Sequence, residues 1–210
     1  MMELSPALRL FRNGLGPEAR ASLDAALARE VERLAAQAPG PERARALHQR
    51  LDAASLDFDA VKPELAAAVR CRSGCAHCCR IWVAITQDEA ELLAERVRQG
   101  AACDRARLQA QQGLQRPGDF AALPLHEARC AFLDSEGRCG VYADRPAACR
   151  SLRVTSDPEL CRDAEASTRI TTLINPLAEL LVSAARSLDA REHPGAPTHL
   201  AARMAGLISG

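Results

Sequence analysis

The sequence has few aromatic side chains and almost no lysine. Aromatic residues make up 3% of the 210 residues, which leaves little for base stacking or for an aromatic-rich β-sandwich core. Lys62 is the only lysine among 27 basic residues, and the others are arginines. Because arginine stays protonated, it serves neither as a Schiff-base amine nor as a general base. Alanine, leucine, arginine and glutamate dominate instead, and this composition favours helices.

The sequence also has no excess of positive or negative charge. The 27 basic and 27 acidic side chains cancel to a net charge of +0, so the sequence predicts no basic face for nucleic acid. The least charged long stretch, residues 170–178, contains Asn175 and Pro176 and is much shorter than a membrane span. We therefore expect neither a nucleic-acid partner nor a membrane partner.

The first twenty residues lack the apolar segment of a secretory signal. They carry Glu3, Arg9, Arg12 and Glu18 and no small-residue cleavage site, so we expect a cytoplasmic protein. In a reducing cytosol, nine cysteines do not form structural disulfides. Their clustering therefore indicates metal binding or redox chemistry.

The common nucleotide-binding, acyl-transfer and zinc-protease motifs are missing too. The sequence contains no GxGxxG, Walker loop, GxSxG or HExxH pattern. No residue is therefore assigned a catalytic role. Whether the chain is an enzyme, and in which oligomeric state it exists, is left open by the sequence.

Apolar periodicity predicts helices in the first seventy residues. From Pro17 to Ala38, apolar residues recur every three or four positions along one helical stripe. Pro39-Gly40-Pro41 ends this helix. The same criterion predicts a second helix at about 42–56 and a shorter one at about 63–69.

Between the two groups of cysteines, a short apolar run precedes further helices. Residues 81–85 resemble a brief strand. Thr86 and Glu89 form a capping-box pattern that opens a helix to about residue 99. Another helix is expected at 103–115.

The second group of cysteines begins in a predicted hairpin. Residues 130–142 form two short apolar arms around a glycine-containing turn, which brings the two cysteines of this segment near one another. Asp144 and Pro146 are helix-start signals. Cys149 is therefore expected in the first or second turn of a short helix.

The last third of the chain predicts a long helix at 167–190, kinked at Pro176, and a final helix at 198–208. These features together predict a mostly α fold, a helical scaffold holding a cysteine-rich metal-binding segment with a short hairpin. We expect one compact domain with three parts: an N-terminal helical segment (1–70), the cysteine cluster metal-binding core (71–161) and C-terminal helices packing on the core (162–210).

Eight of the nine cysteines are candidate metal ligands. The first group comprises Cys71, Cys75, Cys78 and Cys79, and the second comprises Cys130, Cys139, Cys149 and Cys161. The C-x2-C spacing of Cys75 and Cys78 lets two sulfurs reach one ion. The adjacent Cys78 and Cys79 diverge, which indicates a polynuclear site or two separate sites.

Soft thiolates select zinc, copper(I) or iron–sulfur units. The alternative of a buried, inert thiol applies best to the isolated Cys103.

The cysteine-rich segment resembles a known family. Its first group reads Cys71-Arg-Ser-Gly-Cys75-Ala-His-Cys78-Cys79, and its second group continues from Cys130-Ala-Phe-Leu-Asp to Arg-Pro-Ala-Ala-Cys149-Arg. This pattern is similar to the YkgJ-type, or CxxCxxCC, cysteine cluster family, which implies a zinc- or iron-chelating domain. The family commonly opens with C-x2-C, whereas three residues separate the first two cysteines here. A related module in flagellin lysine methylases is associated with an iron–sulfur cluster, but that enzyme's activity does not follow from the module alone.

Four further residues are candidates for binding the cofactor. His77 would be a ligand or a hydrogen-bond donor to sulfur. Arg145 and Arg150 flank Cys149 and would offset the negative charge of the thiolates. Tyr142 would pack over the site. The alternatives are surface ion pairs for the arginines and plain packing for the aromatic ring.

Metal binding leads to two hypotheses about function. The first is an iron–sulfur or iron centre, with a 4Fe–4S cluster favoured, used in electron transfer, in sensing or in modifying a protein or peptide partner. The second is a zinc-stabilised module whose helices bind a protein partner. Iron–thiolate centres are coloured and zinc sites are colourless, so the colour of an anaerobic preparation separates the two.

Overall fold

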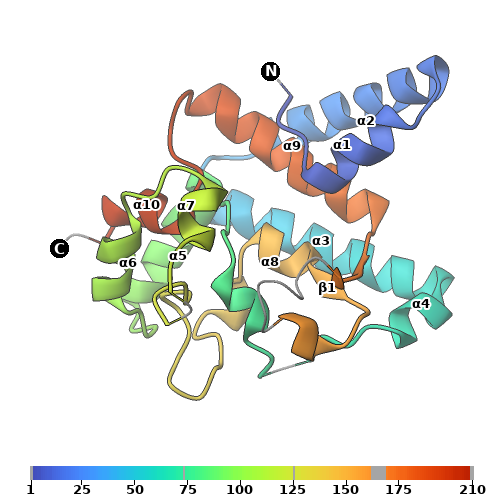
Figure 1. The fold of residues 1–210 in the computed structure, drawn as a ribbon. Helices are drawn as coiled ribbons and strands as arrows, with labels where there is room; N and C mark the ends of the chain where they lie inside the picture. The colour runs from blue at the N-terminus through green and yellow to red at the C-terminus, as the bar shows by residue number, and fades with distance from the viewer. Residues whose placement is uncertain (1, 73, 125, 162–168, 209–210) are drawn as a thin grey trace.

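The computed structural model describes residues 2–72, 74–124, 126–161 and 169–208 (Figure 1). The α-helices in these ranges are α1 (Pro6–Asn13), α2 (Pro17–Ala35), α3 (Pro41–Val61), α4 (Pro63–Ala67), α5 (Gln87–Arg98), α6 (Arg105–Gln111), α7 (Pro117–Ala121), α8 (Ala147–Ser151), α9 (Pro176–Glu192) and α10 (Leu200–Ala205). Short 3-10 helices are η1 (His77–Arg80), η2 (Tyr142–Asp144) and η3 (Pro158–Cys161), and β1 (Arg153–Val154) pairs antiparallel with β2 (Thr172–Leu173). The predicted mostly α fold class is confirmed.

Prolines mark the beginning of the N-terminal helices, because the missing N–H of proline suits the first helical position. α2, α3 and α4 confirm the three helices predicted there. α2 ends at Ala35, before its predicted end, and α3 continues past its predicted end to Val61. The apolar pattern of the sequence does not predict α1. This short helix buries one residue, Leu8, and a single buried position shows no period. The Ser5 hydroxyl caps α1 by accepting a hydrogen bond from the Leu8 N–H at 3.1 Å.

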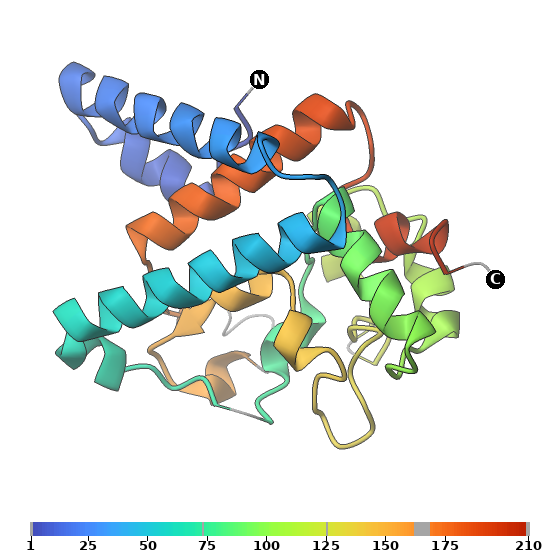
Figure 2. The ribbon, with the colours of Figure 1, turned by 180° about the vertical axis from the view of Figure 1, so that it is seen from behind.

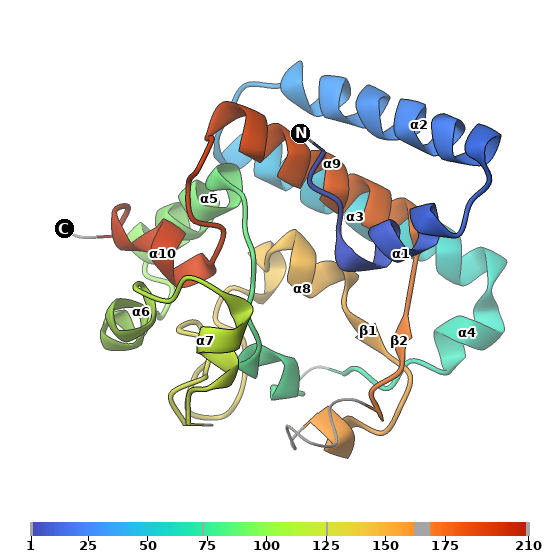
Figure 3. The same cartoon turned by 45° about the horizontal axis from the view of Figure 1, so that its top comes forward.

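α9 packs against both α2 and α3 and forms the first hydrophobic core with them (Figures 2 and 3). The buried leucines of this core are Leu8, Leu27, Leu34, Leu47, Leu51, Leu180, Leu181 and Leu188. Ala147, the first residue of α8, belongs to the same core. The short helix that carries Cys149 is therefore attached to the layer of long helices.

A second hydrophobic core lies beside the cysteine-rich segment. It combines buried residues of α5, α6 and α10 with Val83, Ile85 and the chain at 131–141. Half-buried cysteines at positions 103, 130, 139 and 149 pack against it. The C-terminal helix α10 thus helps to hold three cysteines of the second group, at positions 130, 139 and 149.

The helix predicted at 167–190 with a kink at Pro176 is wrong in its first half. α9 begins at Pro176, and Thr172 and Leu173 belong to strand β2. Asn175 caps the helix, because its side-chain oxygen accepts the N–H groups of Leu177 and Ala178 at 3.1 and 3.3 Å. Proline therefore acts here as the first residue of a helix. Residues 167 and 168 lie outside the described ranges.

The strand predicted at 81–85 is also wrong. Only Ala84 forms a bridge, with His199, although the Leu200 N–H donates to the Val83 carbonyl at 2.9 Å. The hairpin at 130–142 is reduced to one antiparallel bridge between Leu133 and Cys139. These contacts are too short to count as strands.

The remaining helix predictions are confirmed within a few residues. α6 and α10 lie inside the ranges predicted for them, and Cys149 lies in the first turn of α8. α5 begins after Thr86, and both bonds of its capping box are present. Every helix in the described part of the chain is too short or too polar to span a lipid bilayer.

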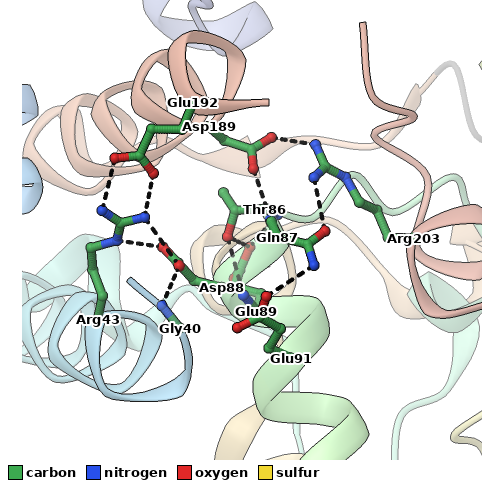
Figure 4. A network of polar contacts seen from close by, with 10 residues as sticks. All are labelled: Gly40, Arg43, Thr86, Gln87, Asp88, Glu89, Glu91, Asp189, Glu192 and Arg203. Atoms are coloured by element: carbon green, nitrogen blue, oxygen red, sulfur yellow. Dashed lines mark hydrogen bonds and ion pairs between the residues drawn. The ribbon is translucent and has the colours of Figure 1, made fainter. Parts of the chain in front are cut away.

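A polar network joins the start of α5 to three other helices (Figure 4). Arg43 of α3 pairs with Asp88 at 2.6 Å and with Glu192 of α9 at 2.5 Å. The Gln87 N–H donates to Asp189 at 2.8 Å, and Arg203 of α10 pairs with the same carboxylate. Because hydrogen-bonded buried charges fix one arrangement of their partners, the network locks α3, α5, α9 and α10 together.

Candidate metal centre

One cavity of about 570 Å³ gathers most of the cysteines. The cysteines that line it come from both groups: Cys71, Cys75, Cys78, Cys79, Cys130, Cys139 and Cys149. All nine cysteines of the chain are free thiols. The fold therefore brings the two groups together around one cavity, although up to 78 positions separate these cysteines in sequence.

The first group lies on irregular chain and a short 3-10 helix. Gly74 has φ of 82°, in the left-handed region, and the Cys75 N–H donates to the Arg72 carbonyl at 3.0 Å. This tight turn leads into η1, which carries Cys78 and Cys79.

Three cysteines of the second group, Cys130, Cys139 and Cys149, are held against the second core. The Cys130 N–H donates to the Cys79 carbonyl at 2.7 Å, which fastens the two groups to each other. Cys139 forms the bridge with Leu133. Cys149 lies in α8 and packs against the core with the other two.

The thiols differ in acidity. A hydrogen bond from Cys79 and the charge of Arg145 lower the pKa of Cys78 to about 7, against the effect of its burial. The same hydrogen bond, together with burial, raises the pKa of Cys79. Burial raises the pKa of Cys130 to about 11 and the pKa of Cys149 well above its ordinary value. Because metal ligation requires thiolates, binding at these residues releases protons.

Cys161 and Cys103 lie outside the cavity wall. Cys161 ends η3, and the nearby Cys75 and Cys71 add to the effect of burial in raising its pKa. Cys161 is therefore close to the first group. Cys103 packs against the second core, and burial raises its pKa.

The donor chemistry of the cavity fits zinc or iron, since soft thiolates line it from several sides. Within the part of the chain that the structure describes, no three Cys, His, Asp or Glu side chains form a group arranged to hold a metal ion.

The comparisons with known proteins agree with the donor set. The family model CxxCxxCC, described as "Putative zinc- or iron-chelating domain", matches residues 70–171. This segment is a CxxCxxCC domain. Neither the search of curated proteins nor the search of solved structures found a match. The domain contains every cysteine of the chain, so metal binding is the property that the family assigns to it.

The four candidate cofactor-binding residues have different positions in the CxxCxxCC domain. Arg145 and Tyr142 line the cavity, with the guanidinium 4.2 Å from the centre of the ring. Arg150 also lines it, but its guanidinium pairs with Asp52 at 2.7 Å and bonds to backbone carbonyls. His77 lies on η1 and is not among the residues of the wall.

An aromatic stack supports the wall of the cavity. Trp82 lines the cavity, and its ring stacks on His199 with centroids 4.2 Å apart. Phe120 contacts both rings edge-on. Burial lowers the pKa of His199 to about 4, so its imidazole is neutral at pH 7. The stack therefore packs an uncharged imidazole against the indole ring that lines the cavity.

Some residues of the site have no signal in the cysteine pattern. Asp52 and Asp59 of α3 line the cavity and pair with Arg150 and Arg153. They come from the N-terminal helices, and nothing in the local sequence links them to the cysteines. Glu89 contributes to the site because it accepts the N–H of Ala147 in α8. Its capping-box pattern in the sequence predicts only its role at the start of α5.

Proposed function

We propose that the CxxCxxCC domain holds an iron–sulfur cluster, with the 4Fe–4S form favoured, through thiolates from both groups of cysteines. The observation that supports this most is the presence of seven cysteines around one cavity. A structural zinc ion takes four ligands in a closed tetrahedron. Seven thiols, two of them adjacent in sequence, exceed what one such ion uses.

The size of the cavity supports a centre larger than one ion. A volume of about 570 Å³ is within the range of sites that hold small organic ligands or cofactors. The adjacent Cys78 and Cys79 were expected to diverge, but their thiols are hydrogen-bonded to each other. A polynuclear centre offers two such neighbouring sulfurs more than one ion to bind. A bound iron centre supplies one-electron transfer or an open coordination position.

The charges of the wall suit an anionic cluster. Asp52 and Asp59 are each paired with an arginine, so their negative charges are already offset. The charge of Arg145 contributes to the lowered pKa of Cys78 and opposes the burial that raises the pKa of Cys139. Its guanidinium therefore stabilises thiolates on both groups, which is the role expected of a residue next to a metal centre.

The mouth of the cavity favours a role that involves a partner molecule. Leu56, Ile81 and Tyr142 line the cavity and are exposed. Exposed apolar side chains around a site are typical of contact with another protein or a peptide. We therefore propose sensing or modification of a protein or peptide ahead of electron transfer alone.

Metal analysis tests the proposal. Full-length protein is purified without oxygen or chelators, and its iron, zinc and acid-labile sulfide are measured together with its visible absorption spectrum. We expect a brown protein with iron and sulfide in equal amounts, because the 4Fe–4S unit contains as many sulfides as irons. A colourless protein with stoichiometric zinc and no sulfide would contradict the proposal and support the zinc-stabilised module.

A further inference from the structure

The helix that carries Cys149 is too short to be stable by itself. α8 comprises five residues, Ala147–Ser151, and isolated helices of this length do not form in water. Its position must therefore come from contacts with other elements. Two such contacts, one at each end, join α8 to the long helices.

The first contact is a buried carboxylate from α5. Glu89 is 2% exposed, and its Oε1 accepts the N–H of Ala147 at 2.6 Å. Its Oε2 accepts the Thr86 N–H at 2.9 Å, and His48 lies within 3.1 Å of Oε1. Burial opposes the ionised form, but His48 and the backbone donors outweigh it and lower the pKa of Glu89. The carboxylate is thus ionised and fully partnered, as a buried charge must be.

The second contact is an ion pair at the other end of α8. Arg150 donates through Nη1 to both oxygens of Asp52 on α3, at 2.8 and 2.7 Å. Its Nε donates to the Arg145 carbonyl at 3.0 Å, and its Nη2 donates to the Ala143 carbonyl. The guanidinium therefore ties α8 to α3 and to the chain before it.

The first group of cysteines is held by backbone hydrogen bonds rather than by a hydrophobic core. Cys130, Cys139 and Cys149 pack against the second hydrophobic core, whereas the cysteines at 71–79 do not. Cys71 is exposed, and its sulfur accepts one hydrogen bond, from the Val154 N–H at 3.1 Å. Cys130, Cys139 and Cys149 are therefore fixed by more packing contacts than the cysteines of the first group.

We propose that Glu89 and the Asp52–Arg150 pair are positioning residues, which fix α8 and so hold Cys149 in place at the cavity before metal binds. This inference rests on the proposed function, since it assumes that metal binds at the cavity. Glu89 acts through the backbone N–H of Ala147 and Asp52 acts through Arg150, and neither is proposed as a metal ligand. Without these residues, α8 has to become ordered when the metal binds. The free energy that this ordering costs should weaken metal binding.

The test compares Glu89→Gln with Thr86→Ala in the full-length protein. Thr86→Ala removes the other half of the capping box and destabilises the same helix, but leaves the bond between Glu89 and Ala147. Zinc affinity is measured by competition with a chromophoric chelator, at a temperature where circular dichroism shows that both variants are folded. We expect Glu89→Gln to bind zinc about tenfold more weakly and Thr86→Ala to keep the wild-type affinity. Equal affinity of Glu89→Gln and wild type would overturn the inference.

A second readout separates positioning from general loss of stability. In metal-free protein, the rate at which iodoacetamide alkylates each cysteine is followed by peptide mass mapping. Release of α8 should speed alkylation of Cys149 and leave Cys103 unchanged, although both pack against the same core. Equal acceleration at both cysteines would indicate general unfolding and would count against positioning.

Asp52→Asn provides a second variant in case Glu89→Gln does not fold. The Asp52 side chain is 55% exposed, so its replacement leaves no buried gap. We expect faster alkylation of Cys149 and weaker zinc binding, and wild-type values for both would overturn the inference. If wild-type protein binds neither zinc nor iron, the proposed function fails, while the alkylation contrast still decides whether these residues hold α8.

Discussion

The backbone N–H of Cys130 donates a hydrogen bond to the carbonyl of Cys79 at 2.7 Å. This bond joins the two groups of cysteines across half of the CxxCxxCC domain, beside a cavity that both residues line. A backbone hydrogen bond between two residues keeps the side chains of those residues close to each other, with or without a bound metal. The metal centre and the fold of this segment should therefore depend on each other.

The first prediction concerns that dependence. Removal of metal with a chelator should lower hydrogen-exchange protection over residues 71–161 and leave residues 18–56 protected. Without a cation, the clustered thiolates repel one another and must take up protons, whereas α2 and α3 are buried against α9 in the first core. Exchange mapped by mass spectrometry on metal-loaded and chelated protein measures both regions. Equal protection of 71–161 in the two forms would show that metal and folding are not coupled.

The second prediction concerns acid stability. Burial lowers the pKa of His199 from 6.5 to about 4, so between these values the unfolded chain binds a proton that the folded chain does not. The free energy of unfolding should therefore fall as the pH drops from 6.5 to 4, by on the order of 2–3 kcal/mol from this group.

His199→Phe isolates this contribution. Phenylalanine retains a ring to stack on Trp82 and does not titrate. Urea unfolding of both proteins at pH 7 and pH 4.5 should show a smaller loss of stability in the variant than in the wild type. Parallel losses in the two proteins would mean that the imidazole is not kept neutral by burial.

The third prediction concerns the polar network at the start of α5. Arg43→Ala should lower the free energy of unfolding by about 3 kcal/mol, because it leaves the carboxylates of Asp88 and Glu192 without their buried partner. Arg33→Ala is the matched control. Arg33 pairs with Glu30 but is 60% exposed, so its loss should cost less than about 1 kcal/mol. Similar costs for the two variants, measured by urea unfolding, would contradict a structural role for the network.

Local signals in the sequence were sufficient for most of the fold. The capping box of Thr86 and Glu89 specifies the start of α5, because both of its bonds form within four residues. Pro176 shows the limit of such signals. A proline is compatible with a kink inside a helix and with the first helical position, and the choice here follows from Asn175, which caps α9 and also donates to the Ala54 carbonyl at 2.8 Å.

The candidate site depends more on tertiary contacts. Spacing identifies the cysteines as potential ligands, but only the fold shows that seven of them share one cavity. The role of Arg150 also differs from a simple counter-charge, because its partner Asp52 lies 98 residues away. Contacts over such distances leave no periodic pattern, and Glu89, 58 residues from Ala147, was missed for the same reason.

The most direct test of the central claim is the metal-to-protein ratio of single cysteine variants purified without oxygen. Serine replaces one cysteine at a time at positions 75, 78, 79, 103, 130, 139, 149 and 161. We predict that Cys75→Ser, Cys78→Ser, Cys139→Ser and Cys149→Ser lose most of the metal, that Cys79→Ser, Cys130→Ser and Cys161→Ser lose part of it, and that Cys103→Ser keeps it. If Cys103→Ser loses its metal while Cys139→Ser and Cys149→Ser keep a full complement, the two groups do not form the centre and the account is wrong.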